Sequence, residues 1–205
     1  MMDVFMNSVD VLGDDVVTDS IIDRSIKEFS DDVITTIGDR AFAQCQALTS
    51  VNCPAVENAG RFAFSYCTAL TSVNLPMLTN MGGIEGHVFE QCSALTSVNL
   101  PMVTTILPNT FNTCRVLQKV DLSSVSIIDQ FAFYSCFALT SLILRNTNVV
   151  NLKQTNAFQN MSMANGACYI YVPSVLVDAY KAATNWSTYA SQIRAIEDYP
   201  EICGG

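Results

Sequence analysis

The chain has 205 residues, of which 50% are hydrophobic and 14% are charged, so it can bury the core of one domain and is not expected to be disordered as a whole. Its formal net charge of −9 argues against nucleic acid and anionic membrane surfaces as partners, because both are polyanions that bind Lys and Arg. No apolar run reaches the roughly 18 residues of a membrane span, so no membrane insertion is expected.

The negative charge is concentrated in the N-terminal segment 1–32, compared with residues 33–168. It contains nine acidic and two basic residues, whereas residues 33–168 contain six of each and are neutral. Residues 1–15 are predicted to form an acidic tail. A short capping helix is predicted over residues 16–29, because the apolar residues there have helical spacing. Those apolar residues are Ile21, Ile22, Ile26 and Phe29.

A motif that begins with Phe recurs five times between residues 42 and 144. In its first copy, Phe42, Cys45, Leu48 and Val51 follow one another at intervals of three residues. Successive copies begin 22, 25, 22 and 22 residues apart, and the longer interval contains a glycine-rich insertion at 82–87. The Phe and Cys pairs of the five copies are Phe42 and Cys45, Phe64 and Cys67, Phe89 and Cys92, Phe111 and Cys114, and Phe133 and Cys136.

Each copy is predicted to form one short strand whose side chains alternate between the interior and the surface. In the first copy Val51 and Cys53 point inward, while Ser50 and Asn52 point outward. One such strand cannot bury its apolar side alone, so the copies stack as a parallel ladder around a shared core. The sequence therefore predicts a leucine-rich-repeat solenoid of about six repeats of 22–25 residues over residues 33–173.

The array is predicted to end in a degenerate sixth copy and a helical cap. The sixth copy begins at Phe158, has Met161 in the Cys position and forms its strand over residues 169–172. Residues 174–205 are predicted to form a C-terminal helical cap and a tail, with Ser174 as the N-cap of the helix. Apolar residues of this segment would cover the open end of the core. They are Trp186, Tyr189 and Ile193.

The pattern Phe-x-x-Cys-x-x-Leu-Thr-Ser-Val-x-Leu-Pro, preceded by Ile-Gly-x-x-Ala-Phe, resembles the BspA-like class of leucine-rich repeats over about residues 33–173. The resemblance implies bacterial surface or secreted adhesion proteins, or related proteins encoded by bacteriophages. The ending from Tyr169 to Trp186 is similar to that of gut-bacterial and phage-associated relatives. Because the N-terminus lacks the basic start and apolar run of an export signal, we expect cytoplasmic synthesis and association with a virion. The cell surface or secretion is the alternative if the N-terminus is trimmed.

No catalytic, cofactor or metal site is predicted. The one histidine, His87, lies in the insertion with no nucleophile at a recognisable spacing, and it is expected to be a solvated loop residue. It cannot complete a Cys/His zinc set, and the aspartate pairs at 14–15 and 31–32 lack the ligand register of a calcium loop. Five of the eight cysteines share one repeat position and are predicted to form an interior column of free thiols. Cys203 is left as the candidate reactive thiol.

The outward strand positions form one face of the ladder, which is the concave face of a curved solenoid. In the first three repeats this face carries only Ser and Asn, but from the fourth repeat it carries charged, aliphatic and aromatic side chains. Tyr and Arg are enriched at binding hot spots, so the C-terminal half of the face is a candidate binding site. Its candidate residues are Lys119, Asp121, Ile143, Arg145, Tyr169 and Tyr171. In the alternative, the Ser and Asn columns only form hydrogen-bonded ladders, and the tyrosines pack under the C-terminal cap.

We therefore expect a non-enzymatic recognition module that binds a protein or glycan on a bacterial surface. Attachment of a phage to its host is favoured over adhesion by a secreted protein, because the export signal is missing. The alternative is an assembly component of a phage or another particle, in which residues 1–32 dock into the particle and the repeats act as a spacer. A stable oligomer formed through residues 1–32 would favour this structural role.

Overall fold

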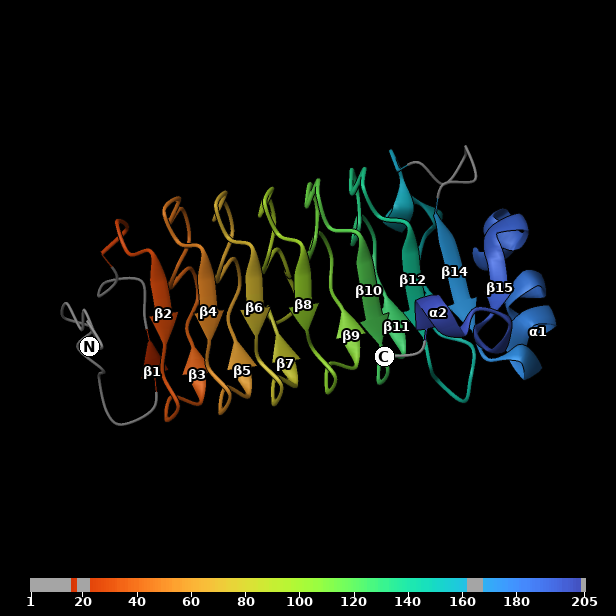
Figure 1. Ribbon diagram of the computed structural model, residues 1–205, viewed down its shortest axis with the longest axis horizontal. Coiled ribbons are helices and arrows are strands. Elements are labelled where there is room, and N and C mark those ends of the chain that lie inside the picture. Colours follow the sequence, from red (N-terminus) through yellow and green to blue (C-terminus); the bar gives the residue numbers. More distant parts are fainter. Residues whose placement is uncertain (1–15, 18–22, 162–167, 204–205) are drawn as a thin grey trace.

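The protein is an elongated solenoid in the computed structural model, which describes residues 16–17, 23–161 and 168–203. The predicted acidic tail, residues 1–15, lies outside these ranges. Figure 1 shows the repeats stacked side by side along the long axis, with longer strands above shorter ones in that view. Within the described ranges, no helix is long and apolar enough to cross a membrane. This parallel stack of short strands is the predicted solenoid architecture.

The longer strands form a parallel ladder, which we call the first ladder. They are hydrogen-bonded in the orders β2-β4-β6-β8 and β10-β12-β14-β15. Equivalent residues of successive repeats face one another, since Val51 pairs with Val73 and Val73 pairs with Val98. The strands are β2 (Glu28–Ser30), β4 (Ser50–Asn52), β6 (Ser72–Asn74), β8 (Ser97–Asn99), β10 (Lys119–Leu122), β12 (Ser141–Leu144), β14 (Tyr169–Val172) and β15 (Ile193–Ala195).

A second parallel ladder runs beside the first and is built from two-residue strands. Its strands pair in the orders β1-β3-β5-β7 and β9-β11-β13. The interruption between β7 and β9 coincides with the glycine-rich insertion, where Gly82 and Gly86 have φ values of 75° and 76°, which glycine adopts without strain. The strands are β1 (Val16–Val17), β3 (Thr36–Ile37), β5 (Asn58–Ala59), β7 (Asn80–Met81), β9 (Thr105–Ile106), β11 (Ile127–Ile128) and β13 (Asn151–Leu152).

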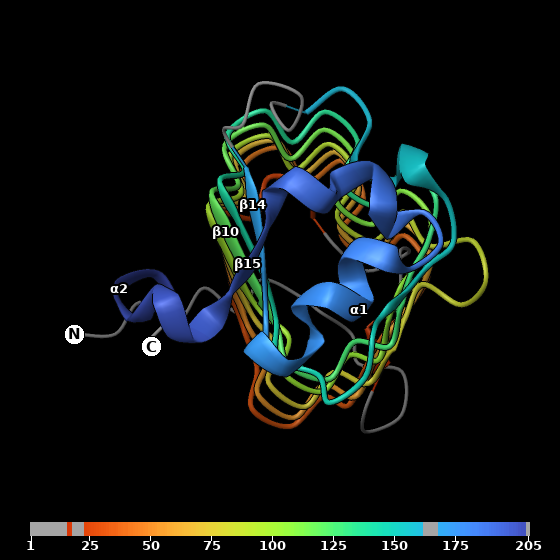
Figure 2. The same cartoon turned by 90° about the vertical axis from the view of Figure 1, so that its right-hand side faces the viewer.

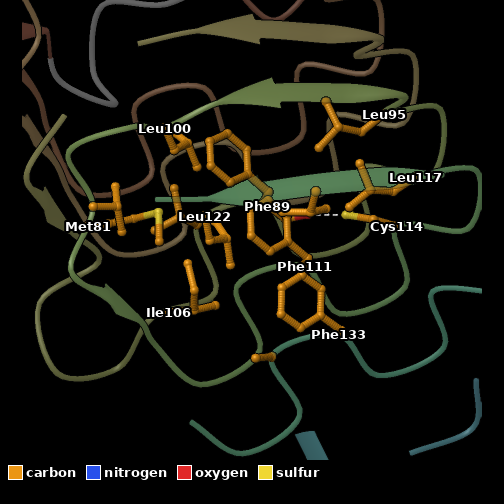
Figure 3. Close-up of a cluster of buried hydrophobic side chains, with 14 of the residues drawn as sticks. Met81, Phe89, Leu95, Leu100, Ile106, Phe111, Cys114, Leu117, Leu122 and Phe133 are labelled. Atoms are coloured by element: carbon orange, nitrogen blue, oxygen red, sulfur yellow. Dashed lines mark hydrogen bonds between the residues drawn. The ribbon is translucent and has the colours of Figure 1, made fainter. Parts of the chain in front are cut away.

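A column of stacked phenylalanines runs through the interior. The rings of Phe42 and Phe64 lie 5.3 Å apart at an angle of 8°, and the stacking continues through the later repeats to Phe158, which lies 5.6 Å from Phe133. Because the motif places one Phe at the same point of each repeat, each ring meets its counterpart in the next repeat. These residues belong to one continuous buried core. Figure 3 shows three rings of this column, Phe89, Phe111 and Phe133. Beside them lie the core residues Leu95, Leu117 and Cys114.

Two residues of each complete repeat adopt a left-handed backbone conformation, one on either side of the buried Phe. In the second repeat these are Phe62, with φ of 56°, and Tyr66, with φ of 61°. Such φ values are unfavourable for residues with a Cβ atom. The N–H group of Tyr66 donates to the carbonyl of Glu90 in the next repeat at 2.8 Å. Equivalent bonds recur along the array, so the turns add hydrogen bonds between repeats that offset the strain.

The N-terminal helix predicted over residues 16–29 is wrong, because strands β1 and β2 lie at the two ends of this stretch. Ile26 and Phe29 stand three residues apart because they occupy the repeat positions of Leu48 and Val51. Phe29 pairs with Val51 in the first ladder. The Leu-x-x-Val spacing of the repeat imitates the spacing of a helix, and the array therefore begins earlier than the sequence predicted.

The C-terminal segment closes the end of the core. Trp186 packs against Phe158, the last ring of the column, with 5.9 Å between centroids, and Tyr189 and Ile193 are buried beside it. Figure 2 shows α1 lying across the end of the solenoid. The helical elements are η1 (Thr155–Phe158), η3 (Ser174–Leu176), α1 (Val177–Ala182), η4 (Trp186–Gln192), η5 (Ile196–Asp198) and α2 (Pro200–Cys203).

The predicted N-cap role of Ser174 is wrong. Ser174 is the first residue of the 3-10 turn η3, whose N-cap residue is Pro173. The N–H group of Ser174 donates to Glu197 Oε2 at 2.9 Å. The first donor of this turn is therefore satisfied by a carboxylate from a later part of the chain.

Candidate functional site

The outward side chains of the first ladder form a surface that we call the ladder face. The strand register and the repeat positions arrange them in two rows that follow the long axis. One row consists of Ser50, Ser72, Ser97, Lys119, Ser141 and Tyr169. The other row consists of Asn52, Asn74, Asn99, Asp121, Ile143, Tyr171 and Arg194.

The ladder face is open and polar in the first three repeats. Asn74 Nδ2 donates to Asn52 Oδ1 at 2.7 Å, and Asn99 Nδ2 donates to Asn74 Oδ1 at 3.1 Å. Ser72 and Ser97 are exposed in the neighbouring row. The Asn column thus forms the hydrogen-bonded ladder that the sequence offered as one explanation. A side-chain amide has two N–H donors and two acceptor lone pairs, so the ladder uses only part of the capacity of Asn74.

The end of the chain covers the C-terminal half of the ladder face. Ile143 is fully buried and Tyr171 is 2% exposed. The cluster that these two residues form packs against Ile196, Tyr199 and Ile202, and the rings of Tyr171 and Tyr199 meet edge to face at 5.4 Å. The prediction that Ile143 is an exposed aliphatic side chain is therefore wrong. Tyr171 packs under the C-terminal segment, which was the alternative considered for the tyrosines.

Three charged candidate residues lie at the border of this covered region. Arg145 donates to the carboxylate of Asp121 from both Nε and Nη2, at distances of 2.7 to 3.1 Å, in the forked geometry that Arg prefers. Lys119 Nζ donates to the carbonyl oxygen of Ile202 at 2.6 Å. The structure brings these three residues together, and their role in binding a ligand stays a prediction.

Tyr169, the last candidate residue, is half-buried beside Arg194. The guanidinium carbon of Arg194 lies 4.6 Å from the centroid of the Tyr169 ring, which is a cation–π distance. Sequence reasoning missed Arg194, because it lies beyond the last recognisable repeat. It extends the ladder face because its backbone pairs with Tyr171.

His87 is not the solvated loop residue that the sequence predicted. It occupies the left-handed position of its repeat, which Phe62 holds one repeat earlier. Its Nδ1 lies 3.0 Å from Glu90 Oε2, and its ring stacks on Phe62 with 4.6 Å between centroids. The guanidinium carbon of Arg40 lies 5.0 Å from the centroid of the same Phe62 ring. Side chains from three successive repeats therefore contact one another here, and His87 interacts with other side chains of the protein rather than with solvent alone.

The predicted interior column of free thiols is confirmed, since all five repeat cysteines are buried and outside any disulfide. Cys114 Sγ donates to the carbonyl of Phe89 at 3.2 Å, and the equivalent bond recurs in the neighbouring repeats. Burial raises the pKa of the Cys67 thiol to about 12. Because the thiolate is the reactive form, these cysteines are packing residues. The side chain of Cys203 lies outside the described part of the structure.

An open hollow of about 410 Å³ lies where the cap meets strand β13. At its wall Trp186 Nε1 donates to the carbonyl of Val150 at 2.6 Å, and Asn185 Nδ2 donates to the carbonyl of Leu152 at 2.7 Å. These bonds give the lining residues a structural role at the end of the ladder. Among the residues that the structure describes, no group of three or more His, Cys, Asp or Glu side chains could hold a metal ion.

Comparisons with known proteins agree with this architecture. A family model described as a BspA type leucine rich repeat region matches in six copies, over residues 23–102 and 60–173. A leucine-rich repeat protein from Bacteroides ovatus aligns with a TM-score of 0.59 and 22% identity, covering 83% of this chain and 42% of that chain. A leucine-rich repeat protein from Eubacterium ventriosum aligns with a TM-score of 0.54 and 20% identity, covering 67% of this chain and 43% of that chain.

The chain thus spans less than half the length of each of these two proteins. Identity at this level shows a shared fold and nothing about function. A comparison with curated proteins finds no match.

Proposed function

Since the chain belongs to the BspA-type leucine-rich repeat family, we propose that it is a non-enzymatic recognition module that binds its partner through the ladder face. Leucine-rich repeats generally serve as protein-interaction modules, because stacked repeats present an extended surface. The proposed partner is a protein or glycan on a bacterial surface. The proposed setting is the attachment of a phage particle to its host, or adhesion if the protein is exported.

The observation that supports this proposal best is the open half of the ladder face. The same Ser and Asn pair stands on three successive strands, β4, β6 and β8. Parallel strands are spaced about 4.8 Å apart, so hydroxyl and amide groups repeat at a fixed interval along this surface. A partner can form hydrogen bonds with such an array without removing a charge from water, which would be unfavourable.

The engagement of the titratable groups also supports binding rather than catalysis. His87 is paired with Glu90, and Asp121 is held by Arg145. The repeat thiols lie in the core, where burial raises the pKa of Cys114 well above its ordinary value. A catalytic nucleophile requires the opposite change, namely a lowered pKa or an adjacent base.

The test is to measure binding of fluorescently labelled protein to a panel of intact bacterial cells and to a glycan array. The double variant Ser72→Arg/Ser97→Arg places two long cationic side chains on the open half of the ladder face, where both serines are exposed. Binding by the wild type and a loss of at least roughly tenfold in the variant are expected, because blocking the centre of an interface removes its main contacts.

A matched control is Ser126→Arg, which changes an exposed serine just before strand β11 of the second ladder. This control should bind like the wild type. Equal binding by the double variant and the wild type would exclude the ladder face as the site. If the wild type binds nothing in the panel and light scattering shows a defined oligomer, the recognition role fails and the assembly role replaces it.

A further inference from the structure

The segment Ile196–Cys203, which we call the tail segment, lies on the ladder face after the chain has completed the cap. Figure 2 shows α2 outside the solenoid, on the side of strands β10, β14 and β15. The contacts of Tyr199 with Tyr171 and of Ile202 with Lys119 show that the segment runs from β14 to β10. Its apolar residues recur at every third position and are Ile196, Tyr199 and Ile202.

The surface beneath the tail segment departs from the repeat pattern. Asn99 and its counterparts occupy the second row of the ladder face in the first three repeats, but Ile143 and Tyr171 occupy this row later. Ser141, in the other row, is also buried there, with 7% exposure. The change to apolar residues falls where the tail segment lies. The ladder itself, and not only the tail, is therefore suited to an apolar occupant.

Opposite charges lie on the two sides of this contact. Lys119, Asp121 and Arg194 border the apolar patch, as the register of β10, β12, β14 and β15 places them. Arg145, which follows β12, is ion-paired with Asp121, so Lys119 and Arg194 give this border its net positive charge. Lys119 Nζ also donates to a backbone carbonyl of the tail segment. Complementary charge of this kind favours one class of partner over others and speeds its encounter. The exposed carboxylates of the tail segment are Glu197, Asp198 and Glu201.

The side chains beneath the tail segment are more completely buried than the apolar side chains of the tail segment itself. Ile143 and Tyr171 are 0% and 2% exposed, whereas Ile196, Tyr199 and Ile202 all remain partly exposed. Segments with few fully buried apolar contacts open locally at a small fraction of the global unfolding free energy. Such opening would uncover a ready-made apolar patch without unfolding the repeats.

We propose that Ile143 and Tyr171, with the cations around them, form a peptide-binding site of which the tail segment is the resident occupant. The external ligand is an acidic segment of another protein that carries apolar side chains at positions i, i+3 and i+6. It binds by displacing the tail segment and reproducing its contacts. The inference concerns the covered half of the ladder face and does not depend on the open half that carries the proposed function.

The test uses the full chain and a fluorescein-labelled peptide with the sequence of residues 195–203, in which Cys203→Ser prevents disulfide formation. The variant Tyr199→Ala/Ile202→Ala weakens the resident segment. Because a tethered occupant competes at high effective concentration, this released variant should bind the peptide with a Kd at least roughly tenfold lower than the wild type does. Fluorescence anisotropy measures both values.

Three controls make the result specific. Adding Ile143→Asn to the released variant should abolish peptide binding, and Asn already stands at the equivalent position of three other repeats, so the array should fold. A peptide with Glu197→Gln, Asp198→Asn and Glu201→Gln should bind several-fold more weakly. The variant Ser72→Arg, which lies two strands away from Lys119 in the same row, should leave peptide binding unchanged, which separates this site from the open half.

The proposal is overturned if the released variant, melting like the wild type, binds the peptide no more tightly than the wild type does. It is also overturned if a scrambled peptide binds equally well, because the three-residue spacing would then be irrelevant. Unchanged binding of the charge-neutral peptide would remove the acidic requirement from the ligand class.

Discussion

The indole Nε1 of Trp186 lies 2.6 Å from the carbonyl oxygen of Val150, where it takes the place of a backbone donor. One repeat earlier the equivalent carbonyl, that of Ser126, accepts an N–H group of the next strand at 2.8 Å. Asn185 Nδ2 does the same for the carbonyl of Leu152 at 2.7 Å. The cap therefore ends the second ladder by supplying, from side chains, the two hydrogen bonds that a further repeat would have made.

The first prediction concerns this replacement. Trp186→Phe keeps an aromatic ring against Phe158 but leaves the buried Val150 carbonyl without its donor, so the free energy of unfolding should fall by about 1–3 kcal/mol. Asn185→Asp keeps the side-chain shape, replaces the donor by an acceptor and should destabilise the protein similarly. Denaturant unfolding followed by circular dichroism measures both. Wild-type stability in both variants would show that the cap works by covering apolar surface alone.

The second prediction concerns the column of thiols. Burial raises the pKa of Cys67 to about 12, whereas a thiol in the unfolded chain ionises near 8.5. The folded state thus holds its proton at a pH where the unfolded state has lost it. The contribution of each buried thiol to the free energy of unfolding is fully present below about pH 8.5. As the pH rises from there toward the folded pKa, this contribution falls by about 1.4 kcal/mol per pH unit.

The measurement is the free energy of unfolding between pH 7.5 and 10. Cys114→Ala serves as the test variant because its thiol is buried and its pKa is raised well above the ordinary value. The variant should be less stable at pH 7.5, but its stability should fall less steeply with pH, by the contribution of one thiol. Identical slopes for variant and wild type would contradict the assignment of the pH dependence to the column.

The repeat array was predictable from the sequence because its signal is redundant. Phe42 and Cys45 recur at a fixed interval in five copies, and a column of identical residues can be buried only by stacking the copies. The prediction of an N-terminal helix is wrong for a related reason, because the three-residue spacing of Ile26 and Phe29 fits both the repeat and the period of a helix. Pairing of Phe29 with Val51 shows which period applies.

The candidate site was less predictable, because its exposure depends on a segment outside the repeats. Outward orientation of Ile143 follows from strand alternation, but nothing in the alternation shows that Tyr199 and Ile202 return to cover it. The unusual apolar residue on a polar row and the three-residue spacing of the tail segment were the available signals. His87 was misplaced because the insertion concealed its equivalence to Phe62 and Asn109.

The third prediction compares two glycines of the insertion. A Cβ atom on Gly86 would clash with the carbonyl oxygen of Pro108, whereas one on Gly83 would meet nothing within 4 Å. Both glycines have positive φ, so Gly83→Ala should lower the free energy of unfolding by about 1–2 kcal/mol through backbone strain alone. Gly86→Ala should lower the free energy of unfolding clearly more than Gly83→Ala does, because the backbone of the next repeat must move. Equal losses in thermal unfolding would show that the insertion can shift away from Pro108.

The last prediction concerns Thr113, a β-branched residue with φ of 64°. β-Branched residues are the least tolerant of this conformation, and Asn is among the most tolerant after Gly. The N–H group of Thr113 donates to the carbonyl of Tyr134 at 2.7 Å, so the hydrogen bonds between repeats hold it there.

Thr113→Asn should therefore stabilise the protein by about 0.5–1 kcal/mol, which raises the Tm by about 1–4 °C for a domain of this size. Thr113→Val is the control, because it keeps the branched Cβ and should bring no gain. If Val raised the Tm as much as Asn, removal of the hydroxyl rather than relief of backbone strain would be the cause. A gain confined to Asn would show that this turn carries strain that the hydrogen bonds between repeats offset.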